Sequence, residues 1–372
     1  MKAHPEGTGP DDLIRWISRL SKSPRPAGSA EGVRACSYFR GVLESTGRFD
    51  VEEGQFEFQR YSPWEWSFKV DGSEVDCAFA LCSASTPRGG VQGELRRFDE
   101  EDLEGKIALL PIRNIHESVA VEDLAQRGAL AVVAYQEWGP TVVGRVAYPK
   151  STIPCLTVSA GVGASLWSKE SAKRQEAQVV VRARTVSARG SNLFATPKRA
   201  GVQTLFTAHR DSRPLSPGAI DNASGSALLL FLAHMTSAPR FSLLSTDAEE
   251  YGLRGARAFV GAGGVVKGTD IVNLDSIGSG PLHLIERSRG GLLSPLLNSK
   301  MDEAAAKAGV SLSRTTTSRG SDSDVFKEAG HRACWVRSYP TPTATTLEDT
   351  VSHVRKAVLG QCSRLLRSFV GA

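Results

Sequence analysis

The sequence lacks the cysteine patterns that mark disulfide-rich proteins and thiolate metal sites. Six of its 372 residues are cysteine, and no two of them form a CxxC pair. Such scattered cysteines indicate buried free thiols. Cys77 and Cys82 are the one pair close enough in sequence to form a bridge.

Long basic runs and long apolar runs are also missing. The net charge of +5 is spread along the chain, so we expect no nucleic-acid partner. The N-terminus MKAHPEGTGPDDLIRW has no apolar core of a secretory signal, and no later stretch approaches the ~20 apolar residues of a membrane span. We therefore expect a cytoplasmic protein with no membrane partner. No pattern indicates an oligomeric state.

What is present is an ordinary globular composition, with 41% hydrophobic and 23% charged residues. The length predicts two domains. Residues 1–60 contain a helix over residues 13–20, which Asp11 or Asp12 can cap, a second helical segment VRACSYFRGVLESTG and a strand FDVEEGQFEFQRY. We take residues 1–60 as the first part of a catalytic domain.

Residues 61–185 change in character to short strands, turns and one helix. GKIALLPIR predicts a buried strand, EDLAQRGALAVVAY a helix followed by a strand, and TIPCLTVS a third strand. This order resembles the β-rich protease-associated domain, and the alternative is a generic α/β insertion. In both cases we expect the insertion to shape substrate access.

Residues 186–372 alternate strands with helices and form the main part of the catalytic domain. The strands are VQTLFTAH, FSLLSTD and IVNLDSIG, and the helices are SGSALLLFLAHM and GLRGARAFV. This alternation predicts an α/β fold with a mixed, largely parallel sheet flanked by helices. Ligands of such sheets bind outside the carboxyl ends of the strands.

Acidic residues and one histidine gather at these predicted strand ends. They are His209 and Asp211, Asp221, Asp247 with Glu249 and Glu250, and Asp275. Several carboxylates in one cleft repel one another unless a cation neutralises them. One imidazole among carboxylates suits Zn²⁺, whereas Ca²⁺ and Mg²⁺ usually bind oxygen alone. The sequence therefore predicts a zinc site.

The same motifs carry a family resemblance. TAHRDS, PGAIDNASG, DAEEYGLRGA, VNLDSIG and RGSDSDVF, in this order, look like the successive motifs of metallopeptidase family 28, and the N-terminal SPRPAGS is also similar. The family contains zinc aminopeptidases and glutamate-carboxypeptidase-like enzymes with a phosphorylase/hydrolase-like fold, and a protease-associated domain commonly interrupts its catalytic domain. The resemblance implies a peptide or small amide as substrate.

The resemblance also implies a role for each of these residues. His209 and Asp275 would hold a first zinc, Asp221 would bridge, and Glu250 would bind a second zinc. Glu249 would act as general base, and Asp211 would orient the imidazole of His209.

The second zinc site departs from the family pattern. Thr345 stands where the family has a histidine ligand, and the family's SDH element is SDS at residues 321–323. His353 or His331 could replace the missing ligand, although each is more simply an ordinary surface or core histidine. One zinc is therefore favoured over two.

Three functions follow from this pattern. The first is a zinc hydrolase of the aminopeptidase type, with an atypical second metal site. The second is acyl transfer without water, similar to the single-zinc glutaminyl cyclases. The third is a catalytically silent relative used for binding, against which the presence of both Glu249 and Glu250 argues.

Overall fold

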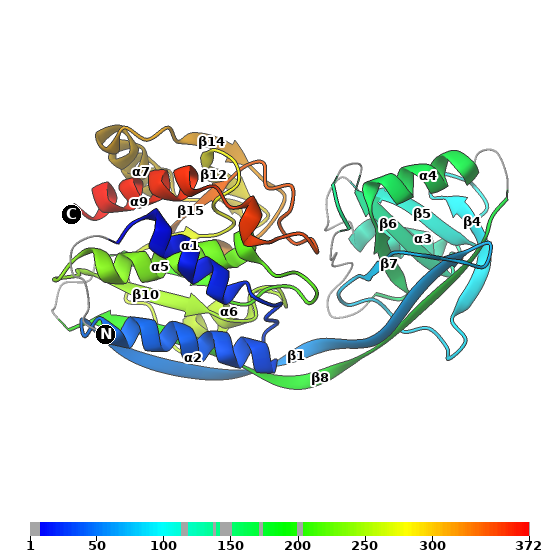
Figure 1. The fold of residues 1–372 in the computed structure, drawn as a ribbon, viewed down its shortest axis with the longest axis horizontal. Coiled ribbons are helices and arrows are strands. Elements are labelled where there is room, and N and C mark those ends of the chain that lie inside the picture. Colours follow the sequence, from blue (N-terminus) through cyan, green and yellow to red (C-terminus); the bar gives the residue numbers. More distant parts are fainter. Residues whose placement is uncertain are drawn as a thin grey trace. The chain divides into compact units, whose positions relative to one another are not determined.

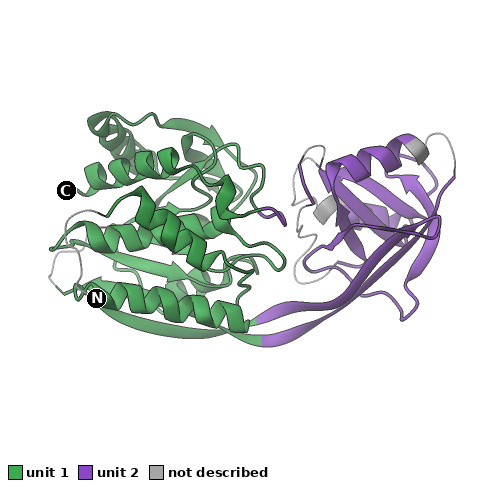
Figure 2. Ribbon diagram, in the orientation of Figure 1, with its two compact units in different colours: residues 1–58, 188–344, 349–372 green, residues 59–187, 345–348 purple. Residues whose placement is uncertain are grey.

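The protein is described by a computed structural model that covers residues 8–112, 118–136, 139–141, 151–170, 174–198 and 204–371. The chain forms two compact units (Figure 2). The first contains residues 1–58, 188–344 and 349–372, and the second contains residues 59–187 and 345–348. The insertion predicted at residues 61–185 belongs to the second unit. Its likeness to a protease-associated domain stays a prediction.

The sheet of the first unit has four adjacent parallel strands at its centre, in the order β15, β11, β9, β10. Figure 1 labels β15 and β10, the outer two of these four strands. Antiparallel strands β12 and β8 flank them, and β13 and β14 pair with β12. The strands are β8 (Glu176–Pro197), β9 (Thr204–His209), β10 (Phe241–Thr246), β11 (Asp270–Leu274), β12 (Leu282–Ser288), β13 (Gly291–Leu292), β14 (Ser313–Thr316) and β15 (Arg332–Ser338). The predicted mixed, largely parallel α/β sheet is thus confirmed. Residues 202 and 203 of the predicted strand VQTLFTAH lie outside the described residues.

Helices cover both faces of this sheet. Successive residues of one strand point to opposite faces, so each strand contributes to the core on either side. Phe206 joins the core formed with α1, α2, α5, α7 and α9, while its neighbour Leu205 packs with residues of α6 and α8. The helices are α1 (Pro10–Leu20), α2 (Ala30–Ser45), α5 (Ser224–Met235), α6 (Arg254–Gly261), α7 (Pro295–Ala308), α8 (Asp322–Glu328) and α9 (Lys356–Val370). Two short turns, η1 (Ala219–Ala223) and η2 (Val351–His353), complete the unit.

Helix α5 is the most deeply buried of these helices. Its residues 224–233 are all buried, which agrees with a sequence that is apolar on every side. Burying one leucine side chain contributes about 1.5–3 kcal/mol, so this helix fixes the position of the turn that precedes it. That turn is η1, which carries Asp221.

The predicted cap of the first helix is wrong. Helix α1 begins at Pro10, and Gly9 is its N-cap residue. The carboxylate of Asp12 instead accepts a hydrogen bond from the backbone N–H of Gly9 at 3.1 Å. Proline is favoured in the first turn because it has no N–H that would need a partner, and it moves the start of the helix ahead of both aspartates.

The second unit has its own sheet, in which β4, β5, β6 and β7 are parallel and β3 pairs antiparallel with β7. Its elements are β2 (Ser73–Val75), β3 (Ala78–Phe79), β4 (Val91–Arg97), β5 (Ile107–Ile112), α3 (Ser118–Gln126), β6 (Ala131–Gln136), β7 (Cys155–Val158) and α4 (Ala160–Glu170). Residue 113, the last of the predicted strand GKIALLPIR, lies outside the described residues.

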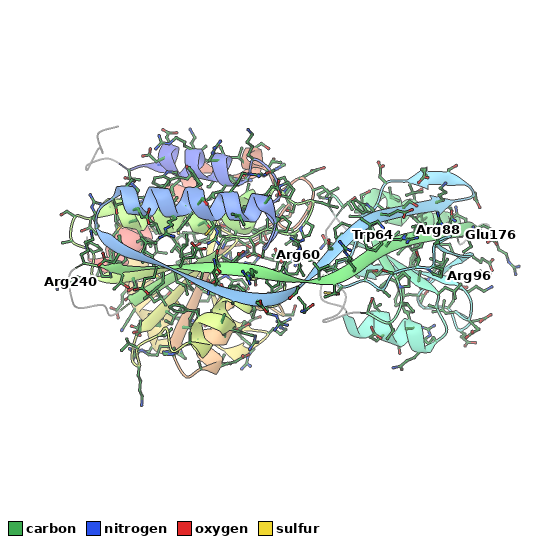
Figure 3. The ribbon with its side chains drawn as sticks, turned by 90° about the horizontal axis from the view of Figure 1, so that it is seen from below. Arg60, Trp64, Arg88, Arg96, Glu176 and Arg240 are labelled. Atoms are coloured by element: carbon green, nitrogen blue, oxygen red, sulfur yellow. The ribbon has the colours of Figure 1, made fainter. Side chains whose placement is uncertain are left out.

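Two long strands belong to both units. They are β1 (Phe49–Val70) and β8, each of 22 residues, and they pair with each other. Figure 3 shows them side by side, with Arg60 and Trp64 on β1. In the second unit, the guanidinium of Arg182 on β8 lies 5.7 Å from the centre of the Trp64 ring, a cation–π contact between the two strands.

All six cysteines are free thiols, so Cys77 and Cys82 form no bridge. Among the described residues, no helix combines the length and the apolar character needed to cross a membrane.

Candidate metal centre

The register of the parallel strands brings the predicted site residues to one edge of the first unit. His209 is the last residue of β9 and lies opposite Thr246, the last residue of β10. Leu274 ends β11 opposite Val336 of β15, so that Asp275 follows directly. The backbone N–H of Asp275 donates to the carbonyl of Val336 at 3.2 Å, which extends the pairing beyond the end of the strand.

Three of the predicted ligands meet at this edge. The Nε2 atom of His209 lies 3.1 Å from Asp221 Oδ1 and 3.6 Å from Asp275 Oδ1. Potential ligand atoms of all three residues lie within 4.8 Å of one another. All three side chains are almost completely buried. A histidine and two carboxylates therefore share one small buried space.

Backbone hydrogen bonds hold Asp221 at this point. The carboxylate of Asp349 accepts hydrogen bonds from the backbone N–H groups of Ile220 at 2.7 Å and Asp221 at 3.0 Å. Gly218, with a φ of +63°, begins the turn, and a Cβ there would lie 2.5 Å from the Asp221 carbonyl oxygen. Only glycine fits such a close approach in the left-handed region. Asp349 is thus a positioning residue for Asp221.

Arg25 holds the loop that joins β9 to this turn. Its buried guanidinium donates to the carbonyls of Arg210 (2.6 Å), Pro217 (2.5 Å) and Gly218 (2.9 Å). The arginine of the N-terminal SPRPAGS segment therefore shapes the chain between His209 and Asp221, a role that the sequence alone does not reveal.

The charges at the cluster depend strongly on one another. Burial lowers the pKa of His209, but hydrogen bonds with Asp211, Asp221 and Asp275 outweigh it and raise that pKa well above the ordinary value. Burial alone would raise the pKa of Asp221, because it disfavours the charged carboxylate, but the interactions with His209, Arg213 and Arg319 lower that pKa to about 2. Each charged form at the cluster is thus favoured by the opposite charge of its neighbours.

Asp211 connects the imidazole to the next strand end. Its backbone carbonyl oxygen lies at hydrogen-bond distance from His209 Nδ1, 3.1 Å, and its Oδ1 lies 3.5 Å from the same nitrogen. The Oδ1 and Oδ2 atoms of Asp211 accept hydrogen bonds from the backbone N–H groups of Glu249 at 3.1 Å and Glu250 at 3.2 Å. Asp211 therefore fixes the histidine ring, mainly through its carbonyl, and the backbone of the two glutamates through its carboxylate.

Glu249 is the partly exposed member of the glutamate pair. Burial raises its pKa well above the ordinary value, and the charges of Glu250, Asp275 and Asp322 add to this effect, whereas His209 opposes it. The side chain is not part of the three-ligand cluster. It is a free carboxyl group with a raised pKa beside that cluster.

Glu250 pairs with an arginine. Its Oε2 lies 2.7 Å from Nε of Arg213, and both side chains are only 4% exposed. Arg213 lies four residues beyond His209, in the loop after β9. The residue predicted to bind a second zinc thus has a fixed cation beside it, and the cluster of potential ligands does not include it.

Three residues were considered for the remaining ligand position. Thr345 belongs to the segment 345–348, which groups with the second unit. His353 is exposed in η2, 3.4 Å from Thr350 Oγ1. His331 follows α8 and is partly buried. Neither histidine belongs to the ligand cluster found among the described residues.

Three further polar residues at this edge were missed by the sequence interpretation. Asp322, the central residue of SDS, is buried, and its Oδ2 accepts from Thr246 Oγ1 at 2.5 Å. Burial raises the pKa of Asp322 to about 7. Arg319 and Arg337 lie near enough for Asp221 and Asp275 to influence their pKa values. The signal for the arginines was weak, because an isolated arginine in a loop or at a strand end is usually solvated.

The geometry of the cluster fits a zinc ion. Four tetrahedral ligands at about 2.1 Å from zinc are separated from one another by roughly 3.4 Å. The two separations measured from His209 Nε2, 3.1 and 3.6 Å, lie on either side of that distance. One imidazole nitrogen and two carboxylate oxygens are also ligands that Zn²⁺ accepts, and they leave a fourth position open.

Known proteins resemble the chain in sequence and fold. The model of peptidase family M28 matches residues 192–370. The chain is 26% identical to the aminopeptidase YwaD of Bacillus subtilis, over 95% of this chain and 82% of that protein. It is 27% identical to the probable lipoprotein aminopeptidase LpqL of Mycobacterium tuberculosis, over 66% of this chain and 54% of that protein, so the match spans about half of that relative. A solved zinc aminopeptidase from Bacillus subtilis has the same fold, with a TM-score of 0.78 and 23% identity over 98% of this chain and 95% of that one.

Proposed function

We propose that this chain is a zinc-dependent hydrolase of peptidase family M28 that cleaves a peptide or small amide bond, with the activity of an aminopeptidase; the match of the family model to residues 192–370 supports this. The single observation that carries the proposal is the buried meeting of His209, Asp221 and Asp275 beside the free carboxyl group of Glu249. The relatives described as aminopeptidases support the choice of reaction.

The three clustered residues would hold one Zn²⁺. Zinc bound there would lower the pKa of a water molecule and polarise the carbonyl of the scissile bond. The chain's own contribution is to fix the ligands. Asp349 positions Asp221, and Asp211 orients the imidazole of His209.

Glu249 is the proposed general base. It would take a proton from the attacking water and pass it to the leaving amine. A base suits this role best when its pKa lies near the working pH, and burial together with nearby acids raises the pKa of Glu249 in that direction. The hydrogen bond from its backbone N–H to Asp211 holds the glutamate beside the cluster.

Arg213 explains how one zinc would be sufficient. In a two-metal site, Glu250 would require a second cation, and here the guanidinium of Arg213 lies 2.7 Å away. This ion pair neutralises the carboxylate permanently. We therefore assign one zinc per chain and give Glu250 a structural role. The second unit would be a protease-associated-like insertion that shapes substrate access.

The proposal is tested by zinc analysis and amide hydrolysis on the same preparations. We expect about one zinc per chain in the wild type, none after His209→Ala, and an unchanged zinc content after Glu250→Gln. Glu249→Gln should keep its zinc and lose about 10²- to 10⁴-fold in the rate of hydrolysis, because it lacks only the base. The exposed Arg240→Gln serves as the control for purification and loading.

Other outcomes distinguish the remaining functions. Two zinc ions per wild-type chain would contradict the role of Arg213. Zinc with cyclised product and no hydrolysis would indicate acyl transfer. Absence of both zinc and activity would indicate a silent relative.

A further inference from the structure

Arg319, at the edge of the metal centre, is a cation that has no partner among the described residues. It lies in the segment before α8, two residues ahead of Ser321, whose hydroxyl accepts a hydrogen bond from Asn273 of β11 at 2.8 Å. The side chain is partly buried. Its guanidinium forms no hydrogen bond or ion pair with any of the described residues. Arginines removed from water are normally paired, so an unpaired one suggests an external anion.

Arg337, on the neighbouring strand β15, is a second cation without a carboxylate partner among the described residues, and its guanidinium lies 5.1 Å from the centre of the Trp335 ring. Its side chain is buried, with a residue exposure of 4%. It donates only to neutral acceptors, the carbonyl of Ser338 and the hydroxyl of Thr341, both at 3.2 Å. Within the described part of the chain, no carboxylate forms an ion pair with it. Val336, the residue before it, accepts the hydrogen bond from Asp275, which places Arg337 beside the ligand end of β11.

The two arginines lie within electrostatic reach of each other and of the metal centre. Burial and the nearby Arg337 and Arg213 lower the pKa of Arg319 to about 10, while Asp221 and Asp275 raise it. Burial lowers the pKa of Arg337, and the same two aspartates raise it. The contacts of Val336 with Asp275 and of Ser321 with Asn273 place the segments that carry both cations at the ligand end of β11.

The balance of charge changes once a cation occupies the site. A divalent ion neutralises the carboxylates of Asp221 and Asp275, and Arg213 already neutralises Glu250. Arg319 and Arg337 would still have no carboxylate ion pair among the described residues. Two cations would thus remain available beside the ligand carboxylates, which favours an anionic group on the substrate.

Building on the proposed hydrolase, we infer that Arg319 and Arg337 form a specificity pocket for a carboxylate of the substrate, close to the scissile amide. Guanidinium groups bind carboxylates with two parallel hydrogen bonds, which gives both affinity and orientation. The carboxylate can be an acidic side chain at the amino terminus or the α-carboxylate of a dipeptide, and the two sources are separable by assay.

Isosteric substrate pairs test this inference on the zinc-loaded full chain. Aspartyl- and asparaginyl-p-nitroanilide differ only in side-chain charge, and leucyl-glycine and leucyl-glycinamide differ only at the carboxyl end. We expect a preference in kcat/KM of about 10- to 100-fold for the charged member of one pair, the scale of a hydrogen-bonded charge pair. The pair that shows the preference identifies the source. Equal rates within both pairs would overturn the inference.

Variants locate the effect. Arg319→Gln should abolish the preference, so that the ratio of kcat/KM for the charged and neutral substrates falls to about one, because only the charged group meets the arginine. Arg319→Lys retains the charge without the planar fork and should retain part of the preference. The control is Arg240→Gln, an exposed arginine before the opposite end of β10, labelled in Figure 3. An equal loss on both substrates in Arg319→Gln would contradict a specificity role.

A binding measurement separates this inference from the proposed reaction. Calorimetry with succinate and with the neutral succinamide uses no turnover. We expect succinate to bind the wild type at least about tenfold more tightly than Arg319→Gln, with succinamide unaffected. If the wild type hydrolyses no amide but shows this difference, the proposed function fails and the pocket stands. If it hydrolyses amides without any carboxylate dependence, the pocket fails alone.

Discussion

The buried ion pair between Arg213 and Glu250 makes a quantitative prediction. Both side chains are 4% exposed, and Nε lies 2.7 Å from Oε2. Replacing Arg213 by methionine leaves a buried carboxylate without its cation, which should lower the free energy of unfolding by about 3–5 kcal/mol. Replacing both residues in Arg213→Met/Glu250→Leu removes the charges together. That variant should lie within about 2 kcal/mol of the wild type, because neither desolvation nor attraction remains.

The pH dependence of the single variant follows from the same contact. Burial raises the pKa of Glu250 above 4.5, and Arg213 opposes this effect. Without Arg213 that pKa rises further. A carboxyl group whose pKa is higher in the folded than in the unfolded protein destabilises the fold increasingly as the pH rises between the two values. The loss in Arg213→Met should therefore be larger at pH 8 than at pH 5.

Urea unfolding of chelator-treated protein, followed by tryptophan fluorescence, measures these differences. Arg257→Met is the control, since Arg257 and Glu328 form an ion pair of 3.3 Å with both side chains about half exposed. That variant should lose no more than about 1 kcal/mol. The reasoning is refuted if Arg213→Met is no less stable than the control. It is also refuted if the double variant loses as much free energy of unfolding as Arg213→Met and Glu250→Leu lose together.

Three further predictions concern residues around the cluster. Asp349→Ala should lower the free energy of unfolding by about 2–5 kcal/mol and weaken zinc binding at least tenfold, because two buried backbone N–H groups lose their acceptor. Urea unfolding measures the first effect, and zinc titration measures the second. Burial raises the pKa of Asp322 to about 7, so in the metal-free protein the folded chain keeps a proton that the unfolded chain releases. Unfolding curves of the wild type should therefore show a stability that falls between about pH 4 and 7, and the fall should be less steep in Asp322→Asn. Arg25→Met should lower the melting temperature strongly, because three buried carbonyls lose their donor, whereas Arg240→Met should not.

Sequence patterns predicted the positions of strand ends better than contacts between side chains. Helix α5 has the bounds of the predicted segment SGSALLLFLAHM, and His209 ends its strand as expected. Both results follow from local apolar runs that are bounded by turn residues. Because parallel strands end at one edge, the meeting of His209 with Asp275 follows from the same local information.

Contacts between distant residues were not predictable in this way. Arg213 and Glu250 are 37 residues apart in sequence, and Asp349 and Ile220 are 129 apart. Neither contact leaves a periodic pattern, because it depends on the path of loops between strands. Arg25 shows the same difficulty, since the carbonyls that it binds are about 190 residues away. A family motif can indicate that such residues matter, but only the fold shows what they bind.

In the proposed one-zinc site, a guanidinium takes the place of a second metal ion, and this would change what the rest of the site must do. A zinc ion offers an open coordination position, through which it can hold a substrate group as well as neutralise a ligand. Arg213 neutralises Glu250 at 2.7 Å through a hydrogen bond, so its charge is directed to that carboxylate and not to the substrate. With one metal position, substrate orientation has to come from other side chains. The unpaired Arg319 and the neighbouring Arg337 are at the right edge of the sheet to provide it, which is why their effect should appear in the choice of substrate and not in zinc binding.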